Sequence, residues 1–159
     1  SALFLSESFP SAKISSIYDN NTFNNFFHNK LIQEYDFLLL STDYYHKFSD
    51  TYSLEDLDLL TNFYSLGEMT KNDFKKYINS KILLNARQIY FCNRFDSSPF
   101  YEPTYESKLS ILDYLIDGFN IKLSQSSGIH NYIMIPRKLF GKKKVRPTSS
   151  RYFDLILKK

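Results

Sequence analysis

The segment FNIKLSQSSGIHNYIMIP, residues 119–136, decides the fold class that this sequence predicts. The stretches FNIKLSQ (119–125) and GIHNYIMIP (128–136) either alternate apolar and polar residues or are continuously apolar, and both patterns are typical of strands. The Ser-Ser-Gly sequence where they meet favours a tight turn. A third stretch of this kind, RYFDLIL, covers residues 151–157. The C-terminal third therefore predicts an antiparallel sheet whose first two strands form a hairpin.

The sequence before Gly118 carries helix signals instead. Apolar residues at helical spacing predict helices over residues 23–34, 54–66, 74–84 and 105–117. Residues that favour helix N-termini precede three of them, namely Thr22, Ser53 with Asp56, and Thr70 with Asp73. Two short runs, DFLLLST at 36–42 and RQIYFCN at 87–93, predict strands, and the proline-broken segment 96–104 predicts a loop.

The predicted fold class is α+β, with N-terminal helices and short strands packed on a C-terminal antiparallel sheet. The chain has 159 residues, of which 43% are hydrophobic, and it contains neither an internal repeat nor a Pro/Gly-rich linker. These properties suit a single compact domain over residues 1–159. The apolar faces predict that the following residues are buried: Phe26, Leu38, Leu39, Leu57, Leu60, Ile89, Phe91, Leu112, Leu115, Ile133, Ile135, Leu155 and Leu157.

Several classes of function lack their sequence signatures here. The histidines and Cys92 show none of the spacings that hold zinc, and neither a P-loop nor a GxGxxG sequence occurs, so we expect no metal and no cofactor. A single cysteine excludes an internal disulfide and favours a reducing compartment such as the cytoplasm, with Cys92 as a small buried residue of a strand. No run approaches the roughly eighteen consecutive apolar residues of a membrane helix, so we expect no membrane partner.

Basic residues concentrate at the C-terminal end. Residues 137–159 contain nine Lys or Arg and one acid, a net charge of +8, whereas the whole chain carries +3. Such a cluster is typical of a surface that binds phosphates or an acidic partner, although charge runs also form solvated loops. We predict that the chain binds nucleic acid, preferably RNA, through Arg137, Lys138, Lys142, Lys143, Lys144, Arg146 and Arg151.

His130 is the candidate catalytic residue of this C-terminal segment. A general base for RNA cleavage needs an imidazole beside cations that stabilise the phosphate, and Tyr152 and Ser149 would orient the ribose or the phosphate. The order Gly-x-His, Lys, Ser, Tyr resembles the end of EndoU-type nucleases, although no upstream histidine matches their second catalytic group. These features imply a metal-independent ribonuclease, and a structural role for His130 on a strand face is the alternative.

Two other interpretations remain open at the level of sequence. The sequence KKVR, residues 143–146, also fits a nuclear localisation signal, and thirteen tyrosines suit an interaction surface. The chain would then be a non-enzymatic virulence effector that docks on an acidic host or partner protein, in the cytoplasm or nucleus of a host cell. Asp43 and His46, which follow the strand predicted at 36–42, form a further acid/base candidate. The sequence does not determine the oligomeric state.

Overall fold

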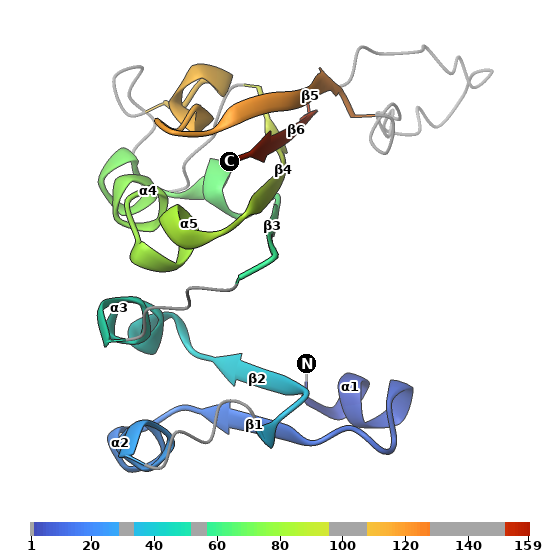
Figure 1. The fold of residues 1–159 in the computed structure, drawn as a ribbon, viewed down its shortest axis with the longest axis vertical. Helices are drawn as coiled ribbons and strands as arrows, with labels where there is room; N and C mark the ends of the chain where they lie inside the picture. The colour runs from blue at the N-terminus through green and yellow to red at the C-terminus, as the bar shows by residue number, and fades with distance from the viewer. Residues whose placement is uncertain (1, 29–33, 52–56, 96–107, 128–151) are drawn as a thin grey trace, which may run out of the picture. The chain divides into compact units, whose positions relative to one another are not determined.

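A computed structural model describes residues 2–28, 34–51, 57–95, 108–127 and 152–159. The chain divides into two compact units, residues 1–52 and residues 53–159, and each is described by itself (Figure 1). Whether the two form the single domain expected from the sequence stays a prediction. No helix within the described ranges combines the length and the apolar character needed to cross a membrane.

The first unit is built around a parallel strand pair. β1 (Ile14–Ile17) pairs with β2 (Phe37–Leu40), and α2 (Asn20–His28) lies between them in the chain. α1 (Ala2–Ser8) precedes this pair and α3 (Thr42–Thr51) follows it. Parallel strands need a crossover connection, which α2 supplies, so the unit is a βαβ motif.

The start of α2 differs from the expected one by a few residues. The helix was expected to begin after Thr22, but Asp19 caps it: the Thr22 amide donates to Asp19 Oδ1 over 2.8 Å. The Asp19 amide in turn donates to Thr22 Oγ1 over 3.3 Å. The hydrogen bond from the Thr22 backbone lowers the pKa of Asp19, because it stabilises the carboxylate form. The predicted strand at 36–42 is confirmed by β2.

The second unit holds a four-stranded mixed sheet in the order β3-β4-β6-β5. Its strands are β3 (Leu59–Phe63), β4 (Gln88–Arg94), β5 (Asn120–Ser126) and β6 (Tyr152–Lys158). β3 and β4 run parallel, whereas β6 runs antiparallel to β4 and to β5. The connection from β3 to β4 contains the 3₁₀ turn η2 (Leu66–Glu68) and the helices α4 (Lys71–Ile78) and α5 (Lys81–Asn85).

The α+β class is confirmed, with two corrections to its details. The helix predicted over 54–66 is wrong for residues 59–63, which form β3. β3 pairs with Gln88–Cys92 of β4, and this contact between distant segments outweighs the helical spacing of its leucines. The sheet is therefore mixed, although its C-terminal pair β5 and β6 is antiparallel as predicted. The predicted hairpin partner at 128–136 lies outside the described residues.

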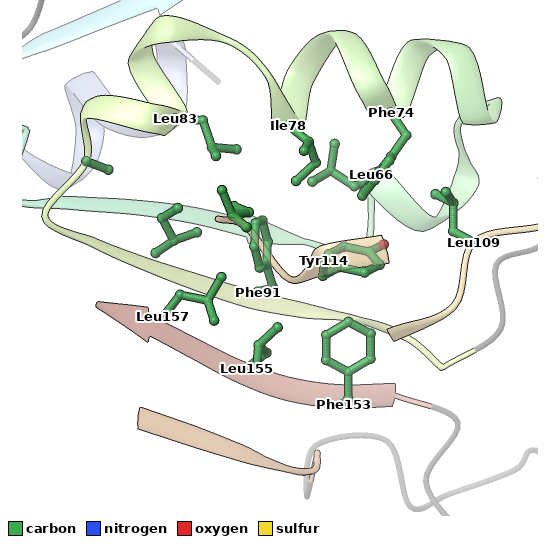
Figure 2. Close-up of a cluster of buried hydrophobic side chains, with 13 residues drawn as sticks. Leu66, Phe74, Ile78, Leu83, Phe91, Leu109, Tyr114, Phe153, Leu155 and Leu157 are labelled. Carbon is green, nitrogen blue, oxygen red and sulfur yellow. The ribbon is translucent and has the colours of Figure 1, made fainter. Parts of the chain in front are cut away.

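α4 begins with the cap that its sequence signals predict, but the single helix predicted over 74–84 is wrong in its bounds, because α4 (Lys71–Ile78) and α5 (Lys81–Asn85) are separate helices. The Thr70 hydroxyl accepts the Asp73 amide over 3.2 Å and donates to the Asp73 carboxylate over 2.9 Å. This arrangement satisfies one of the free N–H groups at the helix start. Figure 2 shows Phe74, Ile78 and Leu83 pointing from the helices toward Phe91 and Leu155 on the sheet, so one face of the sheet carries the core.

The helix predicted over 105–117 is replaced, within the described residues, by one 3₁₀ turn, η4 (Ile111–Tyr114). The Ser110 and Asp113 side chains form a capping box that begins this turn. The turn directs Tyr114 into the core and leaves Leu112 71% exposed and Leu115 44% exposed, so their predicted burial is wrong. Gly118 does adopt a left-handed conformation, with φ of +84°, which glycine permits without strain.

The remaining core predictions hold in part. Five of the named residues are buried, namely Phe26, Ile89, Phe91, Leu155 and Leu157. Leu38, Leu39, Leu57 and Leu60 are half-buried, while Ile133 and Ile135 lie outside the described residues. The buried members on β4 and β6 share one face of the sheet, as strand alternation requires.

Candidate functional site

Of the residues expected to bind or cleave RNA, Tyr152 alone belongs to the described part of the chain. The other candidates lie outside it: His130, Arg137, Lys138, Lys142, Lys143, Lys144, Arg146, Ser149 and Arg151. Tyr152 is the first residue of β6, and its ring is half-buried. The residues around Tyr152 therefore define the candidate site.

The two residues that flank segment 128–151 meet at one end of the sheet. The Ser127 amide donates to the Tyr152 carbonyl over 2.9 Å, directly beyond the last pair of the β5–β6 ladder. Tyr152 also pairs with Arg94, the last residue of β4. Ser127 and Tyr152 therefore both lie at the carboxyl end of β4.

Arg94 connects Tyr152 with an acidic side chain. Its Nε donates to the Tyr152 hydroxyl over 3.2 Å, and its guanidinium carbon lies 5.7 Å from the centroid of the Tyr152 ring. On the other side, Arg94 Nη2 lies 3.8 Å from Glu68 Oε1. The Arg94 and Glu68 side chains remain 36% and 39% exposed, so solvent and ligands reach both charges.

Tyr64 completes the aromatic part of the site. Its ring meets the Tyr152 ring edge-on, with centroids 5.1 Å apart and an angle of 86°. Tyr64 follows β3 with φ of +63°, a left-handed conformation that costs free energy for a residue with a Cβ, and its amide donates to the Cys92 carbonyl over 2.9 Å. Burial, together with a hydrogen bond to Cys92, raises the pKa of Tyr64 to about 12, so its hydroxyl is protonated at neutral pH.

Two asparagines hold the turn that carries Glu68. Asn93, which is fully buried on β4, donates to Asn62 Oδ1 over 3.0 Å and accepts the Gly67 amide over 3.3 Å. Asn62 donates to the Ser65 hydroxyl over 2.7 Å. These bonds fix the chain from Tyr64 to Glu68 against β4, because buried amide groups are costly to leave unpaired.

A second polar group lies on the sheet face opposite the core. Tyr90 donates to Asp154 Oδ1 over 3.0 Å, and the Cys92 thiol lies 3.7 Å from the Ser127 hydroxyl. Cys92 is fully buried, and desolvation raises the pKa of its thiol. A protonated, inaccessible thiol is a poor nucleophile, which agrees with the structural role expected for Cys92.

The position of the site follows from the direction of the strands. β3 and β4 are parallel, so Tyr64 to Glu68 and Arg94 lie at the same edge of the sheet, the carboxyl ends of both strands. In sheets with parallel strands joined by helices, ligands bind outside the carboxyl ends of the strands. We call Tyr64, Glu68, Arg94 and Tyr152 the carboxyl-end site.

Asp43 and His46 both lie on α3 of the first unit. Asp43 occupies the first turn, and the His46 ring meets Tyr45 edge-on with centroids 5.4 Å apart. Their role as an acid/base pair stays a prediction. In the described ranges, no three His, Cys, Asp or Glu side chains come together in a way that would hold a metal ion.

The sequence reasoning missed Tyr64, Glu68 and Arg94. The available signal was position at or shortly after a strand's carboxyl end: Arg94 ends β4, Tyr64 follows β3 directly, and Glu68 lies on the turn after it. The helix assigned to 54–66 concealed this signal, because it placed Tyr64 on an apolar helical face.

Comparison with known proteins found no match: no family model fits the chain, and neither a curated protein nor a solved structure resembles it significantly.

Proposed function

We propose that this chain binds RNA and that one ribonucleotide unit occupies the carboxyl-end site. The observation that carries this proposal is the position of Arg94, which contacts Tyr152 on one side and lies near Glu68 on the other. A cation binds the phosphate of a nucleotide, aromatic rings stack on its base, and a hydrogen-bond acceptor can bind its ribose hydroxyl. Here they come together within one edge of the sheet.

Arg94 suits phosphate binding because Tyr152 orients its side chain, while the described residues do not use all of its N–H donors. Its bond to Tyr152 uses Nε, and the 3.8 Å separation from Glu68 is longer than a direct hydrogen bond. Within the described part of the chain, the terminal guanidinium nitrogens therefore have N–H donors to offer to an anion. A guanidinium binds phosphate through two parallel hydrogen bonds, which fixes the ligand as well as attracting it.

The aromatic residues suit a base. The Tyr64 and Tyr152 rings pack edge-on, which holds them in place, and both residues are half-buried rather than enclosed in the core. Stacking on such a ring contributes about 1–3 kcal/mol per base and tolerates different sequences.

The sequence that precedes β6 is strongly basic. Residues 137–151 contain seven Lys or Arg and directly precede Tyr152, the first residue of β6. In this proposal, these cations contribute further phosphate contacts to a strand bound at the carboxyl-end site. Cleavage of the bound RNA by His130, with Ser149 and Tyr152, is part of the same proposal.

The test compares Arg94→Ala with Arg87→Ala in RNA binding followed by fluorescence anisotropy. Arg87 is the matched control, since it carries the same charge next to the amino end of β4 and pairs with Asp58 over 2.8 Å. Arg94→Ala should weaken binding about tenfold or more and lower the log–log salt slope by about 0.7, whereas Arg87→Ala should change little.

Equal effects of the two substitutions would contradict the assignment of the site. Absence of RNA binding by the unmodified protein at low salt would remove the proposal and favour an acidic protein surface as the partner.

A further inference from the structure

The position of the Glu68 carboxylate suits a hydrogen bond to a ligand better than a role in stabilising the fold. Its side chain is 39% exposed, and the guanidinium of Arg94 is 3.8 Å away, too far for a direct hydrogen bond. Exposed ion pairs of this kind contribute little to stability. The carboxylate therefore has acceptor sites to offer to a bound molecule.

Two other carboxylates of the second unit are engaged by protein groups. Asp154 is 7% exposed and accepts the Tyr90 hydroxyl over 3.0 Å. Asp113 accepts the Ser110 amide over 2.7 Å in the capping box and pairs with Lys71 over 3.5 Å. The Glu68 side chain is more exposed than that of Asp113, at 39% against 26%, and its cationic neighbour Arg94 also contacts the Tyr152 ring.

The turn that carries Glu68 is held before any ligand arrives. Gly67, the preceding residue, is buried and bonded to Asn93, and the Leu66 amide lies 3.4 Å from Asn62 Oδ1. Because the backbone of this turn is already fixed, binding orders only the Glu68 side chain, and such preorganisation of the backbone favours affinity.

We propose that Glu68 accepts a hydrogen bond from the 2′-hydroxyl of the nucleotide whose phosphate Arg94 binds, so that the carboxyl-end site selects RNA over DNA. This inference rests on the proposed RNA binding. A carboxylate can only accept, and the 2′-hydroxyl is the donor that ribose has and deoxyribose lacks. On DNA, the same carboxylate would face the phosphate strand without a donor to compensate its charge.

The experiment measures the affinity of one short single-stranded sequence as RNA, as DNA and as 2′-O-methyl RNA. The unmodified protein should bind RNA about tenfold more tightly than DNA, the usual value of a hydrogen bond to a charged group. The 2′-O-methyl strand, which keeps the sugar conformation of RNA but lacks the donor, should bind like DNA. This comparison requires no variant of the protein.

Glu68→Gln should bring the RNA and DNA affinities to within about threefold of each other, chiefly by weakening RNA, since a neutral amide oxygen is a weaker acceptor. Asp58→Asn is the matched control, because it removes the same charge at an 80% exposed carboxylate near the other end of β4 and should leave the ratio unchanged. Failure to bind either strand would reject the proposed function. RNA binding with a ratio that neither Glu68→Gln nor 2′-O-methylation alters would reject this inference alone.

Discussion

The Tyr114 hydroxyl provides the sharpest test of the core, because removing it should stabilise the protein. The Tyr114 residue is fully buried, and its ring packs against Phe74, Phe91 and Phe153 with centroids 4.9 to 5.2 Å apart. Among the described residues the hydroxyl oxygen has no hydrogen-bond partner. A buried polar group in that state costs about 1–3 kcal/mol.

Tyr114→Phe removes this oxygen and keeps the ring contacts. We expect the free energy of unfolding in urea to rise by about 1 kcal/mol with an unchanged denaturant slope, and the midpoint temperature to rise by about 2–4 °C. Tyr90→Phe is the matched control, since the Tyr90 hydroxyl donates to buried Asp154 over 3.0 Å. This control should lower the unfolding free energy by about 1–3 kcal/mol. A decrease of about 1 kcal/mol or more in Tyr114→Phe would refute the reasoning.

Two further predictions concern pH and the basic segment. Burial raises the pKa of Tyr64 and of Tyr90 from 10.0 to about 12, so their contribution to stability is complete below pH 10.0 and falls as the pH rises through about 12. The unfolding free energies of the unmodified protein and of Tyr90→Phe should therefore approach each other as the pH rises from 10.0 to about 12. A constant difference between the two free energies over this pH range would contradict the prediction. Alanine at residues 142–144 should weaken RNA binding for all sequences and lower the log–log salt slope by about 0.7 for each phosphate that the variant no longer neutralises. In His130→Ala, binding should persist while cleavage falls about 10²-fold or more; intact cleavage would exclude His130 as the base.

The elements that the sequence predicts correctly are those with local signals. α4 follows from Thr70 and Asp73, which satisfy the helix start within four residues of chain. β4 and β6 follow from β-branched and aromatic composition over seven residues each. In these segments the preference of the local sequence agrees with the packing of the folded chain, so composition and periodicity suffice.

β3 was missed because the deciding interaction is not local. Leu57, Leu60 and Phe63 are spaced like one face of a helix, but Leu60 pairs with Ile89 in the parallel ladder. A parallel ladder becomes favourable only after a long crossover connection has formed. η4 shows the reverse case, in which an apolar periodic sequence yields a single 3₁₀ turn that leaves Leu112 in solvent.

The candidate site shows the same limit. Tyr152 was identified from the order of residues in the C-terminal segment, whereas its partner Arg94 lies 58 residues earlier in the chain. Their contact depends on the register of β4 with β6, which pairs Arg94 with Tyr152. A shift of one residue would move either side chain to the other face of the sheet, so neither composition nor spacing predicts the contact.

The mixed direction of the sheet explains why Tyr152 lies at the carboxyl-end site. β3 and β4 run parallel and place their carboxyl ends at one edge. β6 runs against β4, so its first residue, Tyr152, lies at that same edge and the chain that precedes it arrives there. Had β6 been parallel to β4, Tyr152 would lie at the amino end of β4, away from Glu68. The reversal of one strand thus brings Tyr152 to the carboxyl end of β4, where Arg94 contacts it.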